Sequence, residues 1–332
     1  MRGPGVYWTA VDASSERELR VVAFGGGTGL PVLLRGLKDT VADLTAVVTV
    51  TDDGGSSGRL RQELGVAPPG DVRNCLVALA GRSRLAEVFN YRFSAGELSD
   101  HAVGNIIIAA LSDMGGGFVE GVEQAARFLR VRGSVYPAAV ESLTLVVSYE
   151  DGSTVRGETA AVAGGKRISR VAVEPEDAPA PPPVLEAVRA ADVVVLSPGS
   201  LFTSTIPALL GGGVRGELAR FSGPVIYVAN VMTQQGETDG FSVADHVRAI
   251  VGHAGPVVTD VLVHAGELPE STLRRYQGEG AAPAEVGREG LKELGVRLYE
   301  SDLAAPGGDG SGVRHDPDRL AAEVRRVGLL RR

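Results

Sequence analysis

The stretch Ala23-Phe24-Gly25-Gly26-Gly27-Thr28-Gly29-Leu30 decides the fold, and it ends the apolar run 19–24. Four of its eight residues are glycine, and leucines then recur at positions 30, 33, 34 and 37, which is helical spacing. A buried strand that turns through glycines into a helix is typical of α/β proteins that bind a phosphate. Glycine lets the backbone approach the ligand and present its N–H groups, and the helix adds its positive end. The pattern predicts a phosphate-binding turn at Gly25, Gly26, Gly27 and Thr28.

Composition narrows the class of protein. The chain has 332 residues, 44% of them hydrophobic, which is enough for a sizeable core. Its net charge of −8, with scattered Lys and Arg, argues against nucleic-acid binding, which needs a basic stripe, but it does not exclude binding of a nucleotide. Cys75 is the only cysteine, so no internal disulfide can form, and we expect a small core residue in a reducing compartment.

The first 20 residues lack a signal-peptide core, and the longest apolar run, 106–111, is too short to cross a bilayer. We therefore expect a cytoplasmic protein without membrane insertion.

Alternating strand and helix patterns predict a Rossmann-like α/β fold, a parallel sheet with helices on both faces. We expect residues 1–18 to be a flexible lead-in and 19–330 to form a single domain with an insertion at about 75–175. The strands of the sheet are predicted at 19–24, 44–50, 192–196, 225–229 and 258–264. A helix is predicted at about 204–210.

The expected insertion has its own pattern. Helical periodicity dominates 72–131, and Asp151-Gly152 predicts a hairpin between strands at 143–149 and 154–158. We expect the segment 134–173 to lie outside the main sheet, where it could serve as a partner or dimer surface. The polar stretch 51–74 is predicted as a long functional loop, with one or two helical turns at 57–64.

Ligands of such sheets bind beyond the carboxyl ends of the strands, where the winding reverses. If strand 192–196 lies beside the first strand, the glycine turn faces a second small-residue loop, Pro198-Gly199-Ser200. We therefore place a diphosphate site between the two loops. The hypothesis fails if Thr28, Asp53 and Ser200 lie far apart with no shared cavity among them.

Polar residues around these loops are candidate ligands. Asp52 and Asp53 end the second strand, where they could meet a sugar hydroxyl or Mg²⁺, with Asp53 as the metal ligand, or simply cap a turn. Gly54, Ser57 and Arg59 follow, and the run 56–59 predicts an anion nest.

The later candidates are spread along the chain. Asp71 could cap a helix, which leaves Arg73 and Asn74 to face a ligand or to pair with Asp71. His101 and Asn105 would share one helix face if the helix begins early enough. The loop at 230–240 is dense in amides and hydroxyls and could bind a base or a sugar; we call it the amide-rich loop. Tyr276 could stack on a base and Arg314 could pair with a diphosphate, although both residue types are common on surfaces. The candidates in the second loop and the amide-rich loop are Thr203, Asn230, Thr233, Gln234, Gly236 and Thr238.

These segments together resemble the bacterial gluconeogenesis factors of the YvcK type, which are related to 2-phospho-L-lactate transferase. The matching runs are GGGTGLPVLLRGLK, TAVVTVTDDGGSSGRLRQELG, PPGDVRNCLVALA, VRGSVYP, ADVVVLSPGSLFTSTIP and NVMTQQGETDG, followed by DHVRAI, in order over residues 21 to about 265. The chain departs from the family pattern at Asp100, where glycine is usual, and at Ala208, where asparagine is usual. Those departures weaken the assignment of His101 and of the region around Pro207.

The resemblance implies a Rossmann-like fold that binds a nucleotide or a nucleotide-sugar diphosphate, with UDP-N-acetylglucosamine as the favoured ligand. It implies a role in cell shape during gluconeogenic growth. It also implies protein partners in envelope metabolism, and we expect a homo-oligomer. We favour a binder without turnover, because no Cys or His stands in a nucleophile–base arrangement. The alternative is a Mg²⁺-dependent transferase that acts on a nucleotide diphosphate. A third alternative, an NAD-dependent oxidoreductase, lacks the third glycine of the dinucleotide fingerprint, because Leu30 stands there.

Overall fold

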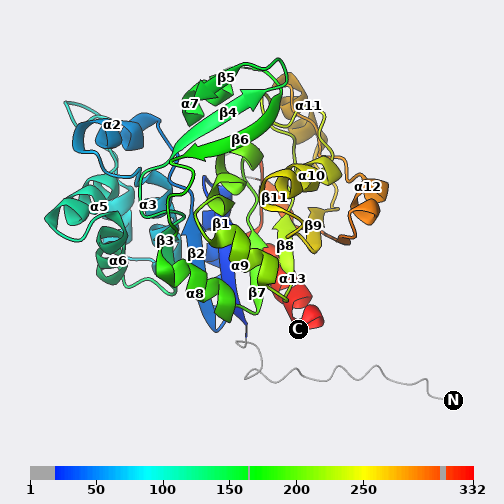
Figure 1. Cartoon of the computed structure of the whole chain (residues 1–332), viewed down its shortest axis with the longest axis horizontal. Helices are drawn as coiled ribbons and strands as arrows, with labels where there is room; N and C mark the ends of the chain where they lie inside the picture. Colours follow the sequence, from blue (N-terminus) through cyan, green and yellow to red (C-terminus); the bar gives the residue numbers. More distant parts are fainter. Residues whose placement is uncertain (1–18, 164, 307–311) are drawn as a thin grey trace.

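The computed structural model describes residues 19–163, 165–306 and 312–332. Its centre is a seven-stranded parallel sheet in the order β10-β9-β8-β7-β1-β2-β3 (Figure 1). The strands of this sheet are β1 Arg20–Gly25, β2 Asp43–Val48, β3 Ser134–Pro137, β7 Val193–Leu196, β8 Val225–Val228, β9 Asp260–His264 and β10 Arg297–Ser301. The winding reverses between β1 and β7, so the predicted neighbourhood of these two strands is confirmed.

Two smaller antiparallel sheets complete the strand set. β4 Thr144–Tyr149 pairs with β5 Thr154–Arg156 and with β6 Ile168–Glu174, and this sheet lies above the end of the main sheet opposite the C-terminus (Figure 1). The hairpin predicted at Asp151-Gly152 is thus confirmed. β11 Ala304–Pro306 pairs with β12 Val313–His315 near the end of the chain.

Helices surround the main sheet. α1, α3 and α13 pack together, while α8 packs on β1 and β2 and lies in front of the sheet in Figure 1. The Rossmann-like α/β prediction is therefore confirmed. The helices are α1 Gly29–Leu37, α2 Gly55–Leu64, α3 Gly70–Leu79, α4 Arg84–Asn90, α5 Val103–Met114, α6 Phe118–Leu129, α7 Glu158–Ala163, α8 Pro182–Ala190, α9 Val214–Arg220, α10 Val243–Ala254, α11 Glu270–Gly278, α12 Arg288–Glu293 and α13 Pro317–Arg331.

Three predictions about elements need correction. The segment 51–74 is mostly helical, because α2 and α3 fill it. A π-helical turn, Leu201–Thr205, and a 3-10 turn, Pro207–Leu209, replace the helix expected at 204–210. β3 lies within the segment expected outside the main sheet, yet it is the edge strand beside β2. The lead-in expected at residues 1–18 lies outside the described residues.

The core consists of aliphatic side chains from the buried strands and from the inner face of α1. Cys75 is buried there, as predicted for a small apolar residue. Burial raises the pKa of its thiol well above the ordinary value, which favours the unreactive thiol form. Within the described ranges, no helix has the length and apolar character to cross a membrane.

Candidate functional site

A cavity of about 360 Å³ lies at the carboxyl ends of β1, β7 and β8. Its volume falls within the range of small-molecule sites, about 300–1,000 Å³. The residues that line it are Gly27, Thr28, Gly29, Val32, Pro198, Gly199, Ser200, Ser204, Asn230, Val231, Met232, Thr233, Gln234, Tyr276, Val313, Arg314 and His315. The cavity therefore lies at the reversal of winding, between the two small-residue loops, where the sequence placed the site.

The glycine turn forms the floor of the cavity. Gly27 has φ +58°, a conformation that favours glycine, and its N–H donates to the Asp71 carboxylate at 2.6 Å. Gly29 begins α1 against the second loop, since a Cβ there would lie 1.8 Å from the carbonyl oxygen of Pro198. Gly29 thus permits the close approach of the two loops, although Leu30 stands where the dinucleotide fingerprint has its third glycine.

Hydrogen bonds join the second loop to the amide-rich loop. Asn230 accepts the N–H of Gly199 at 2.8 Å and donates its amide to the Gly199 carbonyl at 2.7 Å. The Ser200 hydroxyl donates to Oε1 of Gln234 at 2.9 Å. These contacts hold the small-residue loop in place before any ligand binds, so the site is largely preformed.

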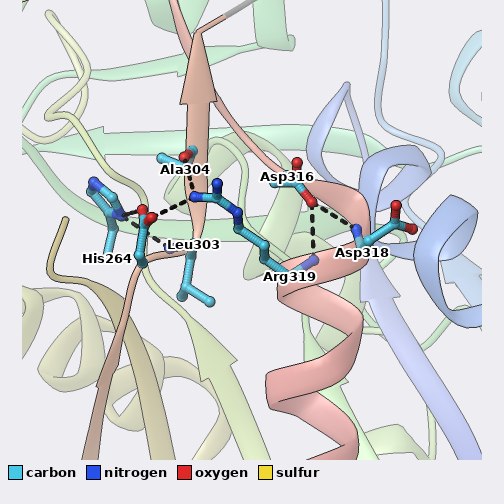
Figure 2. A network of polar contacts seen from close by, with 7 residues as sticks. His264, Leu303, Ala304, Asp316, Asp318 and Arg319 are labelled. Carbon is cyan, nitrogen blue, oxygen red and sulfur yellow. Dashed lines mark hydrogen bonds and ion pairs between the residues drawn. The ribbon is translucent and has the colours of Figure 1, made fainter. Parts of the chain in front are cut away.

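The C-terminal part of the chain supplies the opposite wall. The Tyr276 hydroxyl accepts the N–H of Val313 at 3.1 Å, so α11 supports β12. Figure 2 shows how the end of β12 is held: Asp316 caps α13 through the N–H groups of Asp318 and Arg319. Arg319 in turn reaches Asp302 and the carbonyl of Ala304. This network positions the segment that carries Arg314 and His315.

The structure brings together the candidates from the two loops, the amide-rich loop and the C-terminal wall. The cavity is lined by the candidates Gly27, Thr28, Pro198, Gly199, Ser200, Asn230, Thr233, Gln234, Tyr276 and Arg314. Sequence reasoning did not select Ser204, Met232 or His315 as lining residues. Ser204 stands within a run of hydroxyl residues and His315 follows Arg314, which were signals that could have indicated them.

Asp53 does not line the cavity, although we expected it to share one with Thr28 and Ser200. Its Oδ1 accepts the N–H of Thr159 at 2.9 Å and the Thr159 hydroxyl at 2.7 Å, so it caps α7. The expectation that Asp53 shares this cavity is wrong, because its carboxylate binds Thr159 in α7, the helix that packs on β4 and β5 of the smaller sheet. Asp52 accepts the N–H of Gly54 at 2.9 Å, as in an ordinary turn.

The anion nest predicted at 56–59 does not form, because its polar groups bind within the protein. The Ser56 hydroxyl contacts Nδ1 of His101 at 3.0 Å and accepts the amide of Asn105 at 3.0 Å. The Ser57 hydroxyl accepts the N–H of Gly70, and Arg59 donates to the carbonyl of Ser99. Residues 56, 101 and 105 form a buried cluster, and Ser57 is buried against the start of α3; none of the four lines the cavity.

The remaining candidates support the loops. Thr238 is buried and its hydroxyl accepts the N–H of Gln234 at 2.9 Å, whereas the N–H of Gly236 donates to Asp239. The backbone N–H of Thr203 donates to Glu237. Gly26 lies in the turn but outside the lining; a Cβ there would meet the side chains of Thr49 and Asp71. These residues do not line the cavity; they contact the segments that do.

Carboxyl groups gather behind the glycine turn. Burial raises the pKa of Asp71 to about 6, against the hydrogen bond from Gly27. Burial, then the charge of Asp52, raises the pKa of Glu158 to about 8. In the described ranges no group of three or more His, Cys, Asp or Glu is arranged to hold a metal. Because Mg²⁺ is commonly bound by one or two carboxylates together with phosphates and water, these acids could contribute to a site that the ligand completes.

A larger hollow of about 680 Å³ lies at the opposite edge of the sheet, where Asp192 and Pro224 precede β7 and β8. Its basic side chains are engaged, since Arg189 and Arg220 form ion pairs with Glu217. Ligands of open α/β sheets bind at the carboxyl ends of the strands. Position and chemistry therefore favour the smaller cavity as the site.

A buried histidine under the amide-rich loop gives a pH prediction. Nδ1 of His246 lies 2.8 Å from the Tyr227 hydroxyl, and burial lowers its pKa to about 4 despite neighbouring Asp245. The folded state therefore favours the neutral imidazole. The stability that depends on neutral His246 is present above about pH 6.5 and is lost as the pH falls toward 4. Relative to His246→Asn, the wild type should lose about 2 kcal/mol of unfolding free energy between pH 7 and 5.

Urea denaturation of both proteins at the two pH values measures this difference, and other titrating groups, Glu237 near Tyr227 among them, act in both proteins. A difference between the two proteins that stays constant with pH would contradict the assignment of a neutral His246.

Comparison with known proteins gives one consistent result. A family model described as 2-phospho-L-lactate transferase CofD matches residues 21–304. A gluconeogenesis factor of Halalkalibacterium halodurans is 46% identical over 283 residues, covering 84% of this chain and 88% of that protein. A gluconeogenesis factor of Bacillus subtilis is 42% identical over 306 residues, covering 91% of this chain and 96% of that protein. A crystal structure of a Bacillus halodurans protein superposes with a TM-score of 0.89 at 43% identity, covering 93% of this chain and 99% of that one.

Proposed function

The chain belongs to the 2-phospho-L-lactate transferase CofD family and, within it, to the gluconeogenesis factors of the YvcK type, and on this premise we propose that it is a regulatory nucleotide-sugar-binding protein. The ligand that we propose is UDP-N-acetylglucosamine. The biological role that we infer is the control of cell shape during gluconeogenic growth, through protein partners in envelope metabolism.

The cavity carries this proposal. It joins a glycine turn at the start of α1, suited to a diphosphate, to a loop of amides and hydroxyls, suited to a base or a sugar. Arg314 adds a guanidinium beside Thr28, where it can pair with phosphate oxygens in the charge-assisted way that favours arginine. No Cys lines the cavity, and its one histidine, His315, is buried with a pKa lowered to about 4, chiefly by burial. That inventory favours binding over nucleophilic catalysis.

Calorimetry tests the proposal directly. UDP-N-acetylglucosamine, UDP-glucose, GDP and NAD are titrated into the full chain with and without Mg²⁺. Saturable binding that is tightest for a UDP-sugar is the expected result. If none of the four ligands gives saturable binding, the proposal is refuted, and if NAD binds tightest, the oxidoreductase alternative gains support.

Arg314→Gln should weaken binding of UDP-N-acetylglucosamine by about 10- to 100-fold, because a charge-assisted hydrogen bond to the diphosphate is lost. Arg82→Gln is the matched control, since Arg82 is exposed in the turn before α4, far from the cavity lining. The dissociation constants of both variants are measured by calorimetry at one fixed salt concentration. Equal affinities for the two variants would show that Arg314 does not contact the ligand.

The transferase alternative is favoured by one observation: the Asp71 carboxylate lies beside the glycine turn, and the charge of Asp52 acts on it. Bound Mg²⁺ would supply charge neutralisation of a diphosphate there. Incubation of the chain with a guanosine diphospho-lactate donor and an alcohol acceptor, with and without Mg²⁺, measures release of GMP. Mg²⁺-dependent release at many turnovers would establish an enzyme and overturn the proposal of a binder without turnover.

A further inference from the structure

The helix α6 carries two stripes of residues along its length. One stripe is buried and apolar where α6 packs on α5 and on the edge strand β3. The other stripe has the same helical spacing and faces away from the core; its residues are Glu120, Glu123, Gln124, Arg127 and Phe128. We call this second stripe the outer face of α6. Figure 1 shows α5 and α6 together at one side of the molecule, so the outer face is open to a partner.

The polar side chains of the outer face are unpaired within the described residues. Glu123 and Arg127 stand four residues apart, a spacing at which helices often form an ion pair, but these two side chains form none. The side chains of Glu120 and Gln124 likewise form no hydrogen bond or ion pair with any residue that the structure describes. Their polar atoms can therefore pair across an interface without breaking an internal contact.

Apolar groups and a hollow accompany this stripe. Phe128, at the C-terminal end of α6, is 63% exposed, and Met114, at the C-terminal end of α5, is 81% exposed. A hollow of about 500 Å³ runs along α6; its lining is Gly116, Val119, Glu120, Glu123, Gln124 and Arg127. Met114 stands two residues before Gly116, so an exposed apolar side chain lies near this end of the hollow. One exposed apolar residue would be ordinary on a surface, but here two of them flank a hollow.

The charges of the outer face complement those of a second, antiparallel copy. Glu120 and Glu123 lie toward the N-terminus of α6, whereas Arg127 and Phe128 lie toward its C-terminus. The helix dipole favours this order of charges, but it accounts neither for the exposure of Phe128 nor for the hollow. Two copies of α6 that pack antiparallel about a twofold axis near Gln124 place Glu123 of each copy against Arg127 of the other. The same symmetry brings Phe128 of each copy to the hollow of the other.

We propose that the outer face of α6 is the interface of a twofold symmetric dimer of this chain. The occupant of the hollow is Phe128 of the second copy, and it packs near Met114 in a contact between sulfur and an aromatic ring. The inference goes beyond the proposed function, because no residue of the outer face lines the cavity at the strand ends.

The size of the outer face sets the expected affinity. The helix α6 has 12 residues and is therefore about 18 Å long. Interfaces of standard size bury about 800 Å² on each partner, which is more than one pair of such helices covers. We therefore expect a dimer that dissociates on dilution, with a dissociation constant of about 1 to 100 µM.

Charge exchange tests the antiparallel arrangement by sedimentation velocity of the full chain over this range of concentrations. Arg127→Glu and Glu123→Arg should each raise the dissociation constant about tenfold or more, because each places like charges at both symmetric contacts. The double variant with Glu123→Arg and Arg127→Glu reverses both charges and should recover the wild-type constant within about threefold. An equimolar mixture of the two single variants should form a heterodimer. Arg297→Glu is the matched control, since Arg297 is exposed on β10, at the opposite edge of the main sheet.

The apolar contact has its own test. Phe128→Ser should raise the dissociation constant about tenfold or more, and its melting temperature should stay close to that of the wild type because Phe128 is exposed in the monomer. Thermal melting also confirms that each charge variant is folded.

Three results would overturn the inference. The wild type could remain monomeric up to about 1 mM, at which the expected dimer would be well populated. The dimer could persist unchanged in Arg127→Glu and Phe128→Ser, which would place the interface elsewhere. The single variants could dissociate without recovery in the double variant, which would exclude antiparallel pairing of α6 with itself. Calorimetry with UDP-sugars is a separate measurement, so loss of the dimer and failure of the proposed function are distinguishable.

Discussion

Gly29→Ala is expected to abolish ligand binding and to lower the free energy of unfolding by about 3 kcal/mol or more. The new Cβ would lie 1.8 Å from the carbonyl oxygen of Pro198 and 2.6 Å from its carbonyl carbon. Both atoms belong to the backbone, so no side-chain rotation relieves the overlap. The first turn of α1 must then move away from the second loop, which separates Thr28 from Ser200 and removes the preformed diphosphate cradle.

Urea denaturation and calorimetry with UDP-N-acetylglucosamine measure the two effects of Gly29→Ala. Gly252→Ala is the matched control, because Gly252 is exposed within α10 and a Cβ there would meet nothing within 4 Å. That exchange should stabilise the protein by up to about 1 kcal/mol, since alanine is the better helix former. If Gly29→Ala behaved like Gly252→Ala, the close approach of the two loops would not be needed for the site.

Gly36→Ala is expected to destabilise the protein to a similar extent, about 3 kcal/mol, and to weaken binding at least tenfold without touching the ligand. Its Cβ would lie 2.0 Å from the carbonyl oxygen of Pro317 and 2.8 Å from the Cβ of Ala321. The first turn of α13 must shift, and the preceding residues Arg314 and His315 shift with it. Gly36 therefore positions the C-terminal wall of the cavity from the far side of α1.

A double-mutant cycle separates this positioning role from general destabilisation. If Gly36→Ala acts by displacing Arg314, then adding Arg314→Gln to it should cost far less affinity than Arg314→Gln costs in wild type. Calorimetry on the four proteins measures the coupling, at a temperature where thermal melting shows each to be folded. Additive losses would mean that Gly36 affects the cavity by a route that does not involve Arg314.

The sequence was sufficient for five of the seven strands of the main sheet, because these five are largely apolar runs bounded by turns. It did not predict β10, Arg297–Ser301, which carries charged residues. It misjudged β3, which is short and lies behind a long helical segment, so nothing local separates it from the antiparallel hairpin that follows. It also misjudged 51–74, where glycines and serines hide the helices α2 and α3. These helices are stabilised by tertiary contacts such as that of Ser57 with Gly70, which propensity does not reveal.

The candidates that follow strands line the cavity, whereas many of the others lie outside its lining. The loops after β1, β7 and β8 converge because carboxyl ends of parallel strands share an edge, so Thr28, Ser200 and Asn230 could be foreseen. The side chains of Ser56, His101 and Asn105 satisfy one another in a buried cluster, which spacing along the chain cannot distinguish from a ligand site. Close packing at Gly29 and Gly36 depends on the opposing backbone, which only the fold supplies.

The attachment of Asp53 to Thr159 changes how loss-of-function alleles at this position should be interpreted. An acidic residue after a Rossmann strand invites explanation as a metal or ribose contact, and an inactive Asp53 allele would ordinarily be taken as support. Here the same carboxylate anchors a helix that belongs to a separate antiparallel layer. An allele at Asp53 therefore reports first on whether that layer stays in place, and an allele at Thr159, which does not line the cavity, should have the same phenotype.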